Sequence, residues 1–182
     1  MKSLAYILGF VCGLLAVAVI GVIIGIIAKK ANGGKEPAKY DERQEAIRGI
    51  VFKKAFYTLV IYNIAYGVFD MATGIVWCDR FTGVFIGICL ALTVFAVCSI
   101  MSGAYFRVDE KPTTWLILVA LVSLVNAAIS IIRIVDGEFI IDGILQYNSV
   151  NLIVALMFLA VLIAMAVKRA RDKRGEETEI DE

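Results

Sequence analysis

Five long apolar stretches, separated by shorter polar segments, dominate the pattern of this sequence. A helix rises 1.5 Å per residue, so a stretch of about twenty residues reaches about 30 Å, the hydrocarbon thickness of a bilayer. The pattern therefore predicts an all-α fold, an integral membrane bundle of five transmembrane helices. The predicted spans are residues 4–28, 52–73, 81–104, 114–134 and 150–167. Residues 1–168 would form this single domain, followed by a charged tail at 169–182.

The basic residues predict the orientation of the bundle, because cytoplasmic loops carry an excess of Lys and Arg. With the N-terminus outside, 15 of the 18 basic residues fall on the cytoplasmic side and 3 fall outside. The outer segments carry acidic residues instead. We therefore predict an N-terminus outside and a cytoplasmic C-terminus. The three outer basic residues are Lys2, Arg80 and Arg133.

The composition supports the membrane class, because 60% hydrophobic residues are more than a soluble chain of 182 residues could bury in one core. The first apolar stretch follows Lys2, as in a secretory signal peptide. It is too long for the apolar region of a signal peptide, and it lacks a small-residue cleavage site. We therefore expect a retained helix.

Histidine is absent, which removes the commonest metal ligand and the commonest general base. The four cysteines, Cys12, Cys78, Cys89 and Cys98, have no metal-binding spacing, and three of them fall within predicted spans. No nucleophile, zinc or phosphate-binding motif appears. We therefore expect a protein that is not an enzyme and has no catalytic residue, cofactor or metal, and we expect no nucleic-acid partner.

Two pairs of glycines in the first predicted span have the small-xxx-small spacing that lets helix backbones approach closely. The two pairs lie about 120° apart around a helix, so they cannot face one partner. They could pack within the chain's own bundle, or they could form an oligomer contact between copies. The residues are Gly9, Gly13, Gly21 and Gly25.

Polar residues recur at three- and four-residue steps along the second and the fourth predicted span. Because unsatisfied polar groups in hydrocarbon are costly, such stripes turn toward the bundle interior. Asp70 and Arg133 lie at matched depth, so we predict that helices two and four pack side by side and that these two charges are in contact. The pair could gate an ion or substrate path, or it could fix the helix register. The predicted intramembrane polar seam contains Asn63, Tyr66, Asp70, Asn126, Ser130 and Arg133.

The cytoplasmic loop at residues 29–51 contains early acidic residues and an apolar face with helical spacing. We predict a juxtamembrane helix that begins near Pro37, lies at the interface and bends into the second span near Gly49. Its charged face could dock a cytoplasmic partner, or it could simply be solvated. The candidate cytoplasmic interaction surface contains Tyr40, Asp41, Glu42, Arg43, Gln44 and Arg48.

The tail at residues 169–182 begins basic and ends acidic. Basic clusters beside a span attract the headgroups of anionic lipids. The acidic end has the composition of a disordered segment. We therefore expect a disordered tail whose basic part contacts the bilayer.

The segment Tyr40-Asp41-Glu42-Arg43-Gln44, with Arg48-Gly49 and Phe56-Tyr57-Thr58-Leu59 downstream, resembles a YDERQ-like cytoplasmic motif. Uncharacterised small multi-pass membrane proteins of Gram-positive anaerobic bacteria share this motif ahead of a helix that opens with aromatic residues. The resemblance implies a bacterial plasma membrane. Some such proteins accompany small regulators, which implies a regulatory, sensory or immunity-type role.

The residues and the resemblance together lead to one expected function and one alternative. We expect a non-enzymatic membrane protein that binds a cytoplasmic or membrane protein partner, or anionic lipid, through its basic cytoplasmic face. The alternative is a small transport or channel component that uses the polar seam between helices two and four.

Overall fold

The computed structural model describes residues 19, 22, 40–106 and 112–180. The chain divides into two units, residues 1–39 and residues 40–182. Apart from Val19 and Val22, the first predicted span lies outside the described residues, as do its four candidate glycines. The second unit contains four long helices, which are α2 (Glu42–Thr73), α3 (Arg80–Met101), α4 (Pro112–Val135) and α5 (Val150–Ile180).

Four helical segments in the described part of the chain are long and apolar enough to cross a membrane. This confirms four of the five predicted spans by length and composition. The segments are Glu42–Thr73, Arg80–Met101, Trp115–Val135 and Tyr147–Arg174.

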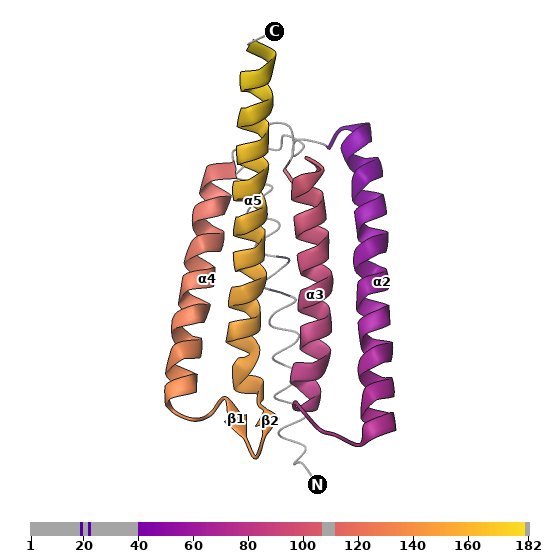
Figure 1. Ribbon diagram of the computed structural model, residues 1–182, viewed down its shortest axis with the longest axis vertical. Helices are drawn as coiled ribbons and strands as arrows, with labels where there is room; N and C mark the ends of the chain where they lie inside the picture. Colours follow the sequence, from indigo (N-terminus) through magenta and orange to yellow (C-terminus); the bar gives the residue numbers. More distant parts are fainter. Residues whose placement is uncertain (1–18, 20–21, 23–39, 107–111, 181–182) are drawn as a thin grey trace. The chain divides into compact units, whose positions relative to one another are not determined.

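The helices of the second unit run up and down, and each packs on a limited set of neighbours. Helix α2 packs on α3, α3 packs on α5, and α5 packs on α4. Figure 1 shows the resulting order α4, α5, α3, α2. The two helices that the sequence pairs through their polar stripes, α2 and α4, therefore lie at opposite edges.

The best-buried apolar cluster joins α3, α4 and α5 toward the end of the unit where α3 finishes. Small and branched side chains fill it, with aromatic residues packed around them. Small residues allow the helix axes to approach, which is how helices gain contact area where lipid removes the hydrophobic drive for association. The buried members are Ala96, Ile100, Val119, Val161 and Ala164.

Helix α2 is held on α3 by two tyrosines that lie over glycines. The ring of Tyr66 covers Gly83 and the ring of Tyr62 covers Gly87, so closely that a Cβ atom at either glycine would overlap the ring. The two tyrosine rings are themselves stacked, with centroids 6.2 Å apart. This ring-over-glycine contact, rather than a polar seam, selects the neighbour of α2.

A short β-hairpin, β1 (Ile140–Ile141) and β2 (Ile144–Leu145), joins α4 to the 3-10 turn that precedes α5. Asp142 and Gly143 have φ values of 53° and 76°, as a two-residue type I′ turn requires. The hairpin also binds the α2–α3 connection, since Leu145 N donates to Trp77 O (3.0 Å) and Asp79 N donates to Leu145 O (2.8 Å). The β-hairpin and the α2–α3 connection are therefore joined by backbone hydrogen bonds.

The structure corrects the predicted bend at Gly49. Helix α2 is continuous from Glu42 to Thr73, with Gly49 in its interior. No group approaches within 4 Å of the place where a Gly49 side chain would lie, so no contact forces a bend there. A helical glycine costs about 1 kcal/mol relative to alanine, which is too little to break a helix that is hydrogen-bonded on both sides.

The expectation of a disordered tail is also wrong over most of its length, because α5 continues to Ile180. The end of the span and the start of the tail are rich in good helix formers such as Ala, Lys and Arg. The Lys168 ammonium pairs with the Asp172 carboxylate one turn later (2.7 Å). Propagating an existing helix costs far less than starting one, so the helix extends past the apolar segment.

Candidate functional site

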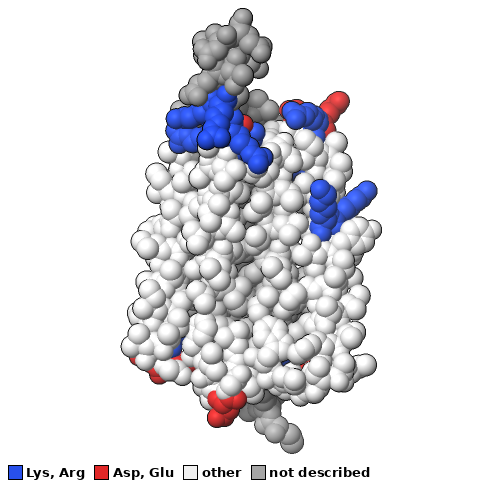
Figure 2. All heavy atoms as spheres, viewed as in Figure 1, with Lys and Arg blue, Asp and Glu red and all other residues white. Residues whose placement is uncertain are grey.

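Charged side chains gather at the two ends of the second unit. Figure 2 shows Lys and Arg concentrated at one end, where α2 begins and α5 leaves the bundle, and Asp and Glu concentrated at the other. This separation agrees with the predicted alternation of basic and acidic connections. The described basic residues at the first end, which we call the basic end, are Arg43, Arg48, Lys53, Lys54, Lys168, Arg169, Arg171, Lys173 and Arg174.

The first turn of α2 begins at this basic end with a reciprocal cap. The Asp41 carboxylate accepts a hydrogen bond from Gln44 N (2.6 Å), and the Gln44 side-chain oxygen accepts one from Asp41 N (3.3 Å). Such a capping box satisfies two backbone donors that a helix start otherwise leaves open. The acidic residues that follow the cap also complement the positive end of the helix dipole.

Three side chains of this segment bind backbone carbonyls beyond the end of α3. Gln44 Nε2 donates to Gly103 O (3.0 Å) and to Phe106 O (3.1 Å). Arg48 Nη1 donates to Ala104 O (3.3 Å), and Tyr40 Oη donates to Tyr105 O (3.3 Å). Helix ends expose carbonyls that have no partner within the helix, and a cation there complements the dipole. We call Tyr40, Gln44 and Arg48 the α2 clasp.

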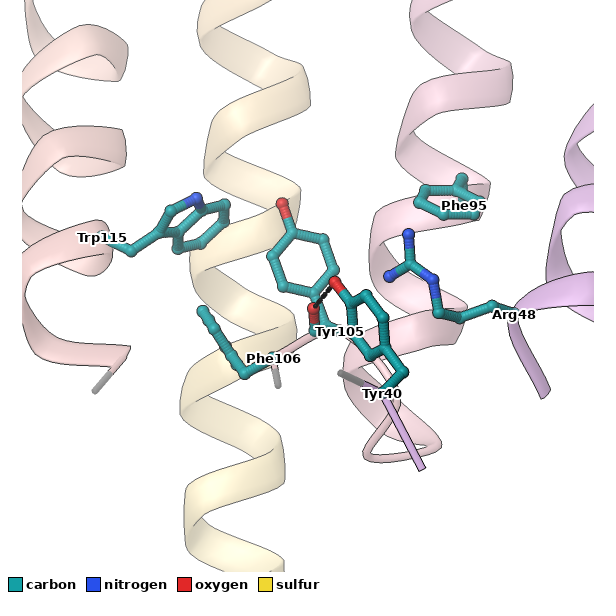
Figure 3. A pocket seen from close by; sticks show the side chains of 6 residues that line it. All are labelled: Tyr40, Arg48, Phe95, Tyr105, Phe106 and Trp115. Atoms are coloured by element: carbon teal, nitrogen blue, oxygen red, sulfur yellow. Dashed lines mark hydrogen bonds between the residues drawn. The ribbon is translucent and has the colours of Figure 1, made fainter. Parts of the chain in front are cut away.

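The Arg48 guanidinium is also held between aromatic rings. Its carbon lies 4.2 Å from the centroid of the Tyr40 ring and 5.4 Å from that of Phe95, within the range of cation–π attraction. Figure 3 shows this arrangement together with the Tyr40 hydrogen bond. The Arg48 guanidinium therefore stabilises the packing of α2 on α3.

Beside the clasp, three aromatic rings pack edge to face with centroids 4.9 to 5.4 Å apart. They belong to Tyr105, Phe106 and Trp115, and together with Tyr40, Arg48 and Phe95 they line a cavity of about 250 Å³. Such edge-to-face pairs stabilise by about 0.5–1.5 kcal/mol each beyond area burial. The rings fix the turn that follows α3 against the start of α4.

The structure divides the predicted cytoplasmic interaction surface into two halves. Tyr40, Gln44 and Arg48 turn inward and form the α2 clasp. Asp41, Glu42 and Arg43 remain exposed at the start of α2. The exposed half therefore makes none of the clasp's hydrogen bonds to the residues after α3. The four-residue step from Gln44 to Arg48 places both on one face of α2 and could be read from the sequence. The sequence did not show that their targets are carbonyls of residues 103–106.

The predicted polar seam does not form, because α2 and α4 are not packed together. Arg133 instead forms an ion pair with Glu138, whose carboxylate also accepts from Asn148 Nδ2 (3.3 Å). Asp70 is exposed on α2, and no described residue forms an ion pair with it. Glu138 is only five residues from Arg133, so pairing with it needs no particular helix arrangement.

The remaining seam residues satisfy their polar groups close by in the chain. Asn63 Nδ2 donates to Leu59 O and Asn126 Nδ2 to Val122 O, both at 2.8 Å. Ser130 Oγ donates to Asn126 O (2.7 Å). Bonds to the carbonyl four residues earlier are available on any helix. Polar residues at helical spacing therefore do not require a facing polar helix.

Tyr66, the remaining residue of the predicted seam, contacts Cys78 at the end of the unit opposite the basic end. Tyr66 Oη accepts a weak hydrogen bond from Cys78 Sγ at 3.7 Å. Cys78 is 2% exposed, and burial raises the pKa of its thiol, so it stays protonated at neutral pH. Over the described ranges, no group of three or more His, Cys, Asp or Glu residues is placed to hold a metal ion.

The fold and the site define a helical chain with four helices long and apolar enough to cross a membrane, a basic end and an acidic end. No protein-family model matches this chain, no curated protein matches it, and no solved structure matches it.

Proposed function

We propose that this chain is a five-span protein of a bacterial plasma membrane, with its N-terminus outside and its C-terminus in the cytoplasm. In this proposal it is a non-enzymatic interaction module that acts in regulation, sensing or immunity. It binds a cytoplasmic or membrane protein partner, and anionic lipid, through its basic end.

The observation that carries the proposal is the position of the charges in the described residues. Asn63, Asn126 and Ser130 bond to carbonyls of their own helices, whereas Lys and Arg collect at one end. A surface of this kind recognises acidic proteins or lipid headgroups, because opposite charges steer and hold such partners. The transport alternative depended on the seam between α2 and α4, which is not formed.

The exposed start of α2 supports a protein partner. The α2 clasp and the capping box fix this turn in position, so Glu42 and Arg43 project from a rigid element. A surface that is already ordered loses little conformational entropy on binding. Glu42 and Arg43 therefore present one negative and one positive charge in fixed positions.

The test is a co-purification from native membranes with the variant Glu42→Ala/Arg43→Ala. Both side chains are exposed and neither is a cap, so we expect unchanged membrane insertion and thermal stability together with loss of the partner that co-purifies with the wild type. The matched control is Arg80→Ala/Asp136→Ala, which removes the same charges at the acidic end and should keep the partner. If both variants keep it, the start of α2 is a solvated surface and the proposal fails.

A further inference from the structure

A groove of about 600 Å³ lies at the basic end between the end of α3, the start of α4 and α5. This volume is typical of sites that bind small ligands, which run from about 300 to 1,000 Å³. Its walls are largely apolar, and its rim is charged. The wall residues include Ile100, Phe106, Leu116, Ile117 and Met165, and the charged residues are Lys168, Arg169, Asp172 and Lys173.

The charged rim comes from one face of α5 and is positive overall. The Lys168 ammonium binds the Asp172 carboxylate at 2.7 Å, so these two charges offset each other. Arg169 and Lys173 are exposed, four residues apart, and so lie one turn apart on the same face. The rim therefore presents two cations to whatever occupies the groove.

The depth of the groove indicates what could enter it. The apolar part of α5 ends at Val167, and the basic residues start immediately after it at Lys168. Basic residues that flank a span lie at the level of the lipid headgroups, whereas the apolar side chains beside them lie at the level of the acyl chains. The groove thus joins a cationic rim in the headgroup layer to apolar walls in the hydrocarbon layer.

We propose that this groove binds one anionic phospholipid. The phosphate lies on Arg169 and Lys173, and an acyl chain follows the wall formed by Leu116 and Ile117. An acidic peptide could pair with the two cations of the rim, but it would have to place its polar backbone against the apolar walls at the acyl-chain level. The acyl chain of a zwitterionic lipid could pack on the walls, but the positive ammonium group of its headgroup would offset the attraction of its phosphate to the rim. The inference deepens the proposed function, on which its cytoplasmic placement rests.

The test uses the purified full-length chain in neutral detergent, titrated with dioleoylphosphatidylglycerol or with dioleoylphosphatidylcholine while thermal unfolding is recorded. We expect the anionic lipid to raise the unfolding temperature saturably and the zwitterionic lipid to have little effect. The variant Arg169→Gln/Lys173→Gln should bind the anionic lipid about thirty-fold more weakly, because each juxtamembrane cation contributes about a fivefold factor. Its unfolding temperature without lipid should match that of the wild type.

The matched control is Lys53→Gln/Lys54→Gln, which removes two exposed cations from α2 outside the groove. It should bind the anionic lipid as the wild type does. Equal weakening by the two double variants would mean that total charge alone attracts the lipid, and it would overturn the proposal.

A second variant tests the acyl-chain wall without any change of charge. Ile117 is 64% exposed, so Ile117→Trp can be accommodated while the indole fills the groove. We expect this variant to lose the effect of the anionic lipid. In the wild type, glycerol 3-phosphate should not compete with the lipid. Competition as strong as that of intact lipid, or normal lipid binding by Ile117→Trp, would show an anion site without a chain site and would contradict the inference.

This experiment and the co-purification fail independently. Lipid binding that is unchanged in Arg169→Gln/Lys173→Gln would reject the groove and leave the start of α2 as the partner surface. A partner set unchanged by Glu42→Ala/Arg43→Ala, with lipid binding lost in Arg169→Gln/Lys173→Gln, would reject the protein-partner proposal and retain the lipid site.

Discussion

Gln44 connects two helix ends that are 59 residues apart in sequence. Its side-chain oxygen closes the capping box of α2, and its side-chain nitrogen binds two carbonyls after α3. One amide therefore satisfies a donor at a helix start and acceptors beyond a helix end. Neighbouring Glu45 is exposed and makes no comparable side-chain bond in the described structure. A substitution at Glu45 is therefore a control for the same substitution at Gln44.

The variant Gln44→Ala should destabilise the protein by about 1–3 kcal/mol, because it removes the reciprocal cap and leaves the Gly103 and Phe106 carbonyls with fewer donors. For a chain of this size we expect the unfolding temperature in detergent to fall by about 2–4 °C per kcal/mol. Glu45→Ala should stay within about 0.5 kcal/mol of the wild type. Equal stability of the two variants would show that the Gln44 bonds are not maintained in solution.

At the scale of elements, the contact between α2 and α3 depends on shape. Gly83 and Gly87 lie one turn apart on α3 and receive the rings of Tyr66 and Tyr62. The spacing is the same small-xxx-small pattern that draws attention to the first predicted span, and here the structure shows what it accommodates. Gly67, on α2, has no group within 4 Å of its potential side chain, so it serves as a control at a helical glycine without a contact.

We expect Gly83→Ala to destabilise the protein by about 1–3 kcal/mol, because the added methyl group overlaps the Tyr66 ring and must displace it. Gly67→Ala should be neutral or stabilising by up to about 1 kcal/mol, because alanine has the higher helix propensity. Thermal unfolding in detergent measures both. The double variant Gly83→Ala/Tyr66→Ala should show a coupling between the two sites, since the ring that the methyl group displaces is gone. Strict additivity would argue against the ring-over-glycine contact.

At the scale of the whole molecule, the described helices alternate so that each connection lies at one of two ends. The basic end holds the start of α2 and the emerging part of α5, and the acidic end holds the β-hairpin and the α2–α3 connection that it binds. Because positively charged connections are retained in the cytoplasm, the proposed orientation places the basic end there and gives every described helix its direction.

The proposed orientation predicts the labelling of single cysteines placed in a background whose four native cysteines are replaced by alanine. A membrane-impermeant maleimide should label Asp136→Cys on intact cells and should label Arg171→Cys only after permeabilisation. Ser3→Cys should be labelled on intact cells, since five spans place the N-terminus opposite the C-terminus. Labelling of Ser3→Cys only after permeabilisation, with the other two as expected, would indicate four spans and a cytoplasmic N-terminus. Reversal of the first two would reject the orientation.

The sequence by itself located the four described apolar helices, because hydropathy is a local property of consecutive residues. It did not determine every bound, since α2 begins at Glu42 rather than at residue 52 and α5 continues to Ile180 rather than ending at residue 167. The predicted span 52–73 ends at the same residue as α2, and the predicted span 114–134 differs from α4 by one or two residues at each end. The sequence also predicted the separation of a basic end from an acidic end, again from a local property. The charged residues that flank each span belong to the connection nearest to them.

Only the tertiary structure decided which helices are neighbours and which polar groups meet. Lipid provides no hydrophobic drive that favours one apolar helix over another, so helix pairing depends on surface shape. The Tyr66 ring over Gly83 selects α3 as the neighbour of α2, through the shape of the ring. The Asn63 and Asn126 amides reach carbonyls on their own helices, so they do not bring α2 and α4 together. Arg133 likewise pairs with Glu138 of the adjoining connection rather than with Asp70, because a partner five residues away is within reach in any packing of the helices.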